Sequence, residues 1–99
     1  MIVPLPENSL SPGDIVKMKF ANLADYDSGE IYTLMILEQS DRVVEEDGSE
    51  DFFPNYKVYC VEDNKIDYFH TYWFHGWPIQ APIPKSVYWH DVLYIEKVF

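Results

Sequence analysis

Residues 55–74 have the sequence NYKVYCVEDNKIDYFHTYWF, which contains the clearest β-hairpin signal in the chain. Three side chains alternate along residues 55–61 and therefore share one face of a predicted strand: Tyr56, Val58 and Cys60. Residues 62–65 (EDNK) predict a tight turn, because Asp and Asn readily adopt left-handed conformations. The aromatic run at residues 66–74 predicts the second strand, so we expect the two segments to pair as an antiparallel hairpin.

Three further segments carry strand patterns. Residues 15–20 (IVKMKF) alternate apolar side chains with lysines after a Ser-Pro-Gly turn signal. Residues 30–38 (EIYTLMILE) could suit a short buried helix, but their β-branched and aromatic content favours a strand. Residues 92–99 (VLYIEKVF) alternate as a closing strand. Five short strands in a chain of 99 residues predict an all-β fold, a small five-stranded antiparallel barrel.

The whole chain, residues 1–99, is expected to form a single domain, because smaller pieces could not bury a core unaided. Residues 1–13 contain three prolines and predict an extended arm. Residues 41–53 predict an acidic loop. Residues 75–91 hold three prolines and two tryptophans, and proline cannot donate a ladder hydrogen bond, so they predict a covering loop over the sheet.

Composition excludes several classes of partner. The formal net charge is −10, from 7 Lys+Arg against 17 Asp+Glu. Nucleic-acid affinity depends mainly on cations that neutralise phosphates, so direct binding to DNA or RNA is not expected, and neither is an anionic membrane surface. The charge favours a basic protein partner. No apolar run approaches the roughly 20 residues that span a bilayer, and the lone Cys60 fits a reducing, intracellular setting.

The order of these parts resembles a known group of proteins. An opening Pro-Gly-Asp-Ile-Val at residues 12–16 precedes a strand and a long loop, a second strand at residues 30–37, and then the hairpin. In this order the chain resembles the small SH3-like β-barrel proteins often encoded by tailed bacteriophages, especially those infecting marine cyanobacteria. The resemblance implies an SH3-like barrel without catalytic residues or a cofactor, located in the host cytoplasm or, alternatively, in the virion.

Catalytic and metal-binding patterns are weak. His70, His75 and His90 could bind a metal ion with a nearby carboxylate, but histidines scattered among aromatic residues are typical of packing or loop positions. Cys60 lacks an activating glycine turn, and a free cysteine is typically a small core residue. The chain has only 4 glycines and no phosphate-binding glycine loop. We therefore expect neither an enzyme nor a metal site.

Two groups of residues are candidates for binding a partner. Residues 41–51 carry six carboxylates against a single cation, Arg42, which predicts either a solvated loop or an acidic contact surface. The candidate contact carboxylates are Glu45, Glu46, Asp47, Glu50 and Asp51. Rings on both faces of the predicted strand at residues 66–74 either lie under the covering loop or form an exposed aromatic groove for an extended peptide. The candidate anchors are Tyr72, Trp73, Trp77 and Trp89.

The sequence thus predicts a non-enzymatic, acidic protein–protein interaction module that binds a basic host or phage protein. One alternative is a structural or decoration protein of the virion that assembles on its own copies. A second alternative is a DNA mimic, whose carboxylates imitate phosphates and occupy the basic cleft of a host nucleic-acid-binding or defence protein.

Overall fold

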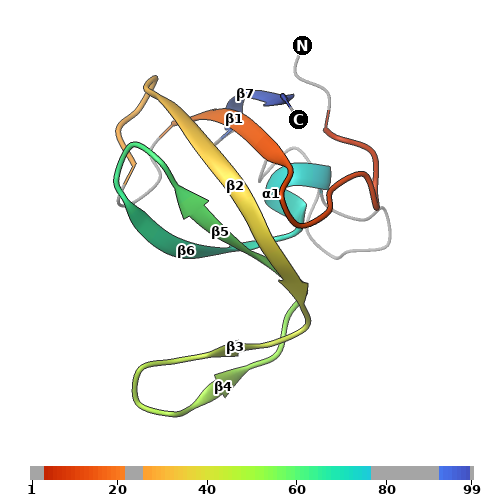
Figure 1. Ribbon diagram of the computed structural model, residues 1–99, viewed down its shortest axis with the longest axis vertical. Coiled ribbons are helices and arrows are strands. Elements are labelled where there is room, and N and C mark those ends of the chain that lie inside the picture. Colours follow the sequence, from red (N-terminus) through yellow and green to blue (C-terminus); the bar gives the residue numbers. More distant parts are fainter. Residues whose placement is uncertain (1–3, 22–25, 77–91, 99) are drawn as a thin grey trace.

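Five strands form one antiparallel sheet in the order β6-β5-β2-β1-β7 (Figure 1). The computed structural model describes residues 4–21, 26–76 and 92–98. The strands of this sheet are β1 (Ile15–Phe20), β2 (Ile31–Ser40), β5 (Asn55–Cys60), β6 (Lys65–His70) and β7 (Val92–Lys97). Every neighbouring pair in the sheet is antiparallel, so the prediction of an all-β fold with a five-stranded antiparallel sheet is confirmed.

The predicted hairpin is present as β5 and β6, paired from Asn55↔His70 to Cys60↔Lys65. At its turn Asn64 has φ 49°, in the left-handed region that Asn tolerates well. The prediction that the second strand continues to Phe74 is wrong. Strand β6 ends at His70, and residues 72–75 form a short helix.

Strand β6 ends at His70 because its partner strand, β5, offers no further residues to pair with. Strand β5 begins at Asn55, and Pro54 before it has no N–H to donate, so the ladder ends with Pro54 accepting a bond from Thr71 N–H at 3.1 Å. The chain then turns into α1 (Tyr72–His75), where the N–H groups of Phe74 and His75 donate to the carbonyl of Thr71. Helix α1 thereby buries Phe74 completely.

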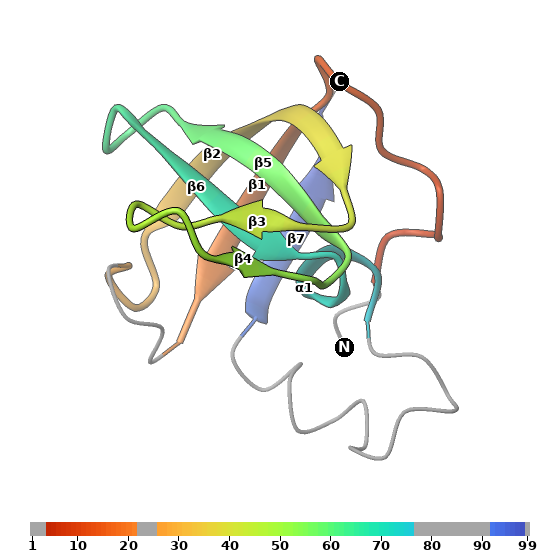
Figure 2. The ribbon, with the colours of Figure 1, turned by 90° about the horizontal axis from the view of Figure 1, so that it is seen from below.

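Figure 2 shows that the sheet is curved. The core lies on one face of it. The three apolar side chains predicted to alternate along β1 are fully buried: Val16, Met18 and Phe20. So are the three predicted to share a face of β5: Tyr56, Val58 and Cys60. The ring of Phe20 stacks on Phe69 at 5.8 Å and meets Tyr26 at 5.1 Å between ring centroids.

The sheet is not closed by hydrogen bonds, because β6 and β7 lie at its two edges and do not pair with each other over the residues described. The N-terminal segment runs beside α1 and the start of β1. In it Leu5 N–H donates to Phe74 O at 2.9 Å, Leu10 is buried, and Gly13 N–H donates to Ile36 O at 2.7 Å.

The segment expected to be an acidic loop instead contains a second hairpin. Strands β3 (Val43–Val44) and β4 (Glu50–Asp51) form a separate two-stranded sheet. This hairpin projects away from the main sheet (Figure 1). Of the predicted covering loop, residues 77–91 lie outside the described residues. Within the described part of the chain, no helix has the length and apolar character needed to span a membrane.

Candidate functional site

The tip of the projecting hairpin is an ordered turn. Residues 41–53 are called the acidic hairpin from here on. Glu45 N–H donates to Ser49 O at 2.8 Å, and Gly48 adopts φ 88°, a conformation that favours glycine. The Asp47 carboxylate accepts hydrogen bonds from Ser49 N–H at 2.9 Å and Ser49 Oγ at 2.6 Å. These bonds lower the pKa of Asp47, so its charge helps to hold the turn.

The root of the acidic hairpin is fastened to the main sheet by one buried amide. Asn55 is 1% exposed, and its Nδ2 donates to the carbonyls of Ser40 at 3.3 Å, Arg42 at 3.2 Å and Phe53 at 3.0 Å. The carbonyls of Ser40 and Arg42 lie on the segment that enters the hairpin, and the carbonyl of Phe53 lies on the segment that leaves it. Because the amide ties the two segments to β5, it sets the direction in which the hairpin leaves the sheet.

The charges on the acidic hairpin are poorly balanced. Arg42 pairs with Glu50 at 3.1 Å, and both side chains are well exposed. Glu45 instead lies beside Asp51, and a hydrogen bond between the two carboxyl groups raises the pKa of Glu45. The negative charges of Asp51, Asp47 and Glu46 raise the pKa of Glu45 further. The hairpin therefore presents like charges that a cation from outside would stabilise.

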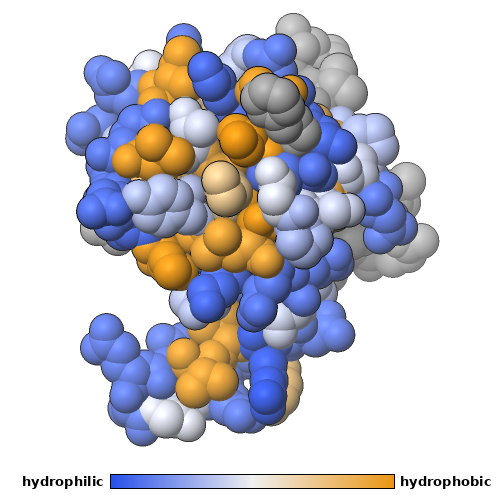
Figure 3. Space-filling view, in the orientation of Figure 1, coloured by the Kyte–Doolittle hydropathy of each residue, from blue (hydrophilic) through white to orange (hydrophobic). Residues whose placement is uncertain are grey.

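The same hairpin exposes apolar surface. Phe52 is 75% exposed and Val44 is 56% exposed. Figure 3 shows apolar side chains between hydrophilic ones on the projecting hairpin. Large exposed rings next to charges are typical of protein interfaces, where they act as anchors.

The predicted aromatic anchors have different environments. Trp73 is half-buried and packs edge-on against Phe20 at 6.1 Å and Phe69 at 6.4 Å, so its ring adjoins the core. Tyr72 is half-buried beside His70, at 4.2 Å between ring centroids. Trp77 and Trp89 lie outside the described residues. The structure thus gathers the candidate carboxylates on the acidic hairpin and places Tyr72 and Trp73 on α1, near the root of the hairpin and not at its tip.

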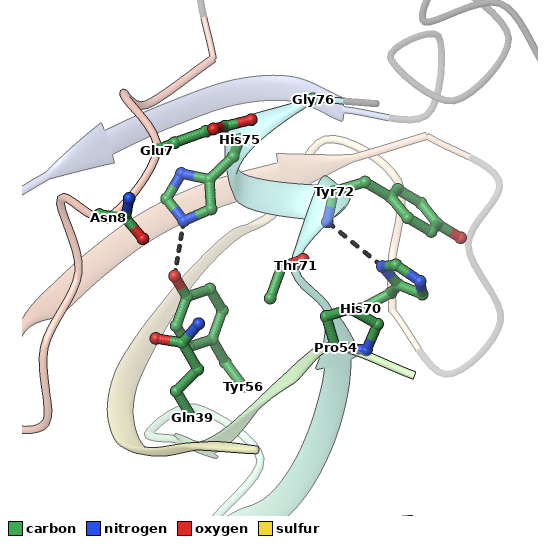
Figure 4. Close-up of a pocket in the computed structure, with 10 residues that line it drawn as sticks. All are labelled: Glu7, Asn8, Gln39, Pro54, Tyr56, His70, Thr71, Tyr72, His75 and Gly76. Carbon is green, nitrogen blue, oxygen red and sulfur yellow. Dashed lines mark hydrogen bonds between the residues drawn. The ribbon is translucent and has the colours of Figure 1, made fainter. Parts of the chain in front are cut away.

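A pocket of about 180 Å³ opens where the N-terminal segment, the end of β2, the start of β5 and α1 meet (Figure 4). Its polar lining includes Glu7, Asn8, Gln39, Tyr56 and His75. None of these five was a predicted binding residue. They come from four segments far apart in the sequence, and no spacing pattern connects them.

A partly buried hydrogen-bonded pair, Tyr56 and His75, lines this pocket. His75 Nδ1 lies 3.0 Å from the carbonyl of Leu5, which can only accept, so Nδ1 carries the proton. In the neutral ring Nε2 then accepts from the Tyr56 hydroxyl at 2.6 Å. Burial raises the pKa of Tyr56, so its hydroxyl keeps its proton at neutral pH.

The described histidine and cysteine side chains considered for metal binding and catalysis lie apart from one another or are engaged in packing. Within residues 4–21, 26–76 and 92–98, no group of three or more His, Cys, Asp or Glu side chains is arranged to hold a metal ion. His90 lies outside these ranges. His70 stacks on Phe53 at 5.3 Å. Cys60 is fully buried, and burial raises the pKa of its thiol.

No family model, no curated protein and no solved structure matches the chain. The resemblance to SH3-like phage proteins therefore remains a prediction.

Proposed function

We propose that this chain is a non-enzymatic module that docks a basic protein, and that the acidic hairpin is its contact surface. One observation carries the proposal: a hairpin that projects from the sheet bears six exposed carboxylates and one cation, together with two exposed apolar side chains. A loop that served only for solubility would not need an exposed Phe52 or a buried amide that fixes its direction.

The mechanism has two stages. At long range, the clustered carboxylates attract a positively charged surface and raise the encounter rate, an effect that salt screens over about 8 Å at physiological ionic strength. At contact, a cation beside Glu45 and Asp51 offsets the negative charge of the carboxylates gathered there. Phe52 and Val44 then lose their exposed apolar surface to the partner, which slows dissociation.

We also propose that the sheet that carries the acidic hairpin is an SH3-like barrel. The five-stranded antiparallel sheet and the Pro-Gly-Asp opening of β1 support an SH3-like barrel of the kind encoded by tailed phages. Such a module would act in the host cytoplasm on a basic host or phage protein. The proposal extends no catalytic role to any residue.

The test uses variants chosen from the hairpin geometry. Glu45, Glu46 and Asp51 are replaced by Gln, Gln and Asn. Asp47 is kept because it holds the turn, and Glu50 because it pairs with Arg42. The matched control removes three exposed carboxylates elsewhere, with Asp27→Asn, Glu30→Gln and Glu38→Gln.

Wild type and both variants are used for quantitative affinity capture from a lysate of the host. We expect a basic protein that is lost with the hairpin variant and kept with the control variant. Equal capture by all three proteins would overturn the proposal. Competition by duplex DNA would instead indicate the DNA mimic, and recovery of the chain in stoichiometric amounts from purified phage particles would indicate a virion protein.

A further inference from the structure

The pocket beside α1 is continuous with the root of the acidic hairpin. Gln39, at the pocket rim, directly precedes the segment that enters the hairpin, and Pro54 directly follows the segment that leaves it. Phe53 of the hairpin stacks on His70, which also lines the pocket. A partner that binds the hairpin therefore lies within reach of the pocket.

The pocket is rich in hydrogen-bond acceptors. Over the described residues, the side chains of Glu7, Asn8 and Gln39 form no ion pair and no hydrogen bond, so a carboxylate and two amide oxygens can accept from a ligand. The Tyr56 oxygen already donates its proton to His75 and keeps lone pairs for a further donor. Both nitrogens of the His75 ring are engaged.

The charge and shape of the pocket narrow the ligand class. Of the ten described residues that line it, none is Lys or Arg, so the carboxylate of Glu7 is not neutralised there. In Figure 4 the acceptors Asn8 and Gln39 lie on the same side as the Tyr56–His75 pair, while Thr71 and Pro54 lie toward the other side and offer apolar surface. A volume of about 180 Å³ admits one long side chain, not a folded element.

We propose that this pocket binds the guanidinium group of an arginine side chain of the basic partner, an inference that rests on the proposed function. A guanidinium group has five N–H donors in a planar fork and suits acceptors arranged around it, whereas an ammonium group has three donors at one point. Its charge is balanced by Glu7, and its methylene stem lies on Pro54 and the methyl group of Thr71. The hairpin attracts the partner and the pocket fixes its position.

The test is an NMR titration of the isotope-labelled full chain with N-acetyl-arginine amide. We expect saturable shift changes at Thr71, His75 and Gly76, weak binding, and little response to the uncharged citrulline derivative. The lysine derivative binds about threefold more weakly than the arginine derivative. Glu7→Gln weakens arginine binding about fivefold, because a charge-assisted hydrogen bond is lost. Glu30→Gln, which removes an exposed carboxylate outside the pocket, leaves binding unchanged.

Several outcomes would overturn the pocket assignment: equal shifts with the citrulline derivative, unchanged binding in Glu7→Gln, or shifts confined to residues 44–52. The triple hairpin variant separates this inference from the proposed function. If the pocket is right, that variant still binds N-acetyl-arginine amide with the same shifts. A pocket that fails to titrate, while partner capture still depends on the hairpin carboxylates, refutes the pocket and leaves the docking function standing. Saturable arginine binding in the pocket, together with partner capture that does not depend on the hairpin carboxylates, refutes the docking function alone.

Discussion

Replacing Asn55 by Ala should detach the acidic hairpin from the sheet and destabilise the whole protein. The side chain of Asn55 is 1% exposed, and its Nδ2 group serves three carbonyls at 3.0–3.3 Å. Two N–H groups can form about two good bonds at once, and each buried bond contributes about 1 kcal/mol net, with a further cost for carbonyls left unsatisfied. We therefore expect a loss of about 2–3 kcal/mol. In a domain of this size that lowers the midpoint of thermal unfolding by roughly 8–24 °C.

The assay is urea unfolding followed by tyrosine and tryptophan fluorescence, with hydrogen exchange at the hairpin amides as a second measurement. Gln39→Ala is the matched control, because it removes an exposed amide that forms no hydrogen bond within the described residues. Asn55→Asp tests the chemistry, since a carboxylate of the same shape faces carbonyls that it cannot donate to. It should be at least as unstable as Asn55→Ala at pH 7. A loss below about 0.5 kcal/mol for Asn55→Ala would refute the assigned role.

Three other predictions follow from the hydrogen bonds and pKa shifts. Tyr56→Phe removes the buried donor to His75 and should cost about 1–2 kcal/mol in urea unfolding, with the His75 ring signals shifted; an unchanged free energy would contradict the bond. At the hairpin tip, the pKa of Glu45 is raised and that of Asp47 is lowered. Glu45→Gln should therefore raise or preserve the midpoint of thermal unfolding at low salt, whereas Asp47→Asn should lower it. A fall in the midpoint for both variants would be inconsistent with the opposite pKa shifts. Burial lowers the pKa of His70, so the unfolded chain takes up its proton first and the free energy of unfolding falls as pH drops below about 6.5. His70→Phe keeps the ring on Phe53 and should show a smaller fall between pH 7.5 and pH 5, and an equal fall would exclude His70 as the titrating group.

Local patterns predicted β1 and β5 well because one face of each of these strands is buried. The alternation in β1 and β5 corresponds to side chains that are buried and partly exposed in turn, and the predicted Asp-Asn turn contains the left-handed Asn64. Helix α1 was not predicted, because its residues are aromatic and carry strong strand propensity. What overrides that propensity is tertiary: the neighbouring strand begins only after Pro54, so residues beyond His70 have no ladder to join.

The candidate site was predicted only in part. The run of carboxylates at residues 41–51 can be recognised from the sequence alone, and the structure places it on one projecting hairpin. The role of Asn55 could not be predicted, because asparagine at the start of a strand is equally typical of an ordinary turn. The pocket is less predictable still, since Glu7, Gln39 and His75 meet only through the fold.

The central claim is that the carboxylates of the acidic hairpin attract a basic protein. The most direct measurement is the association rate constant of the captured partner as a function of salt concentration, for wild type, for the triple hairpin variant and for its matched control. We predict that the rate constant falls steeply with salt for wild type and control, and that the hairpin variant associates at least tenfold more slowly at low salt with a much shallower dependence. Identical rates and identical salt dependence for all three proteins would contradict the account.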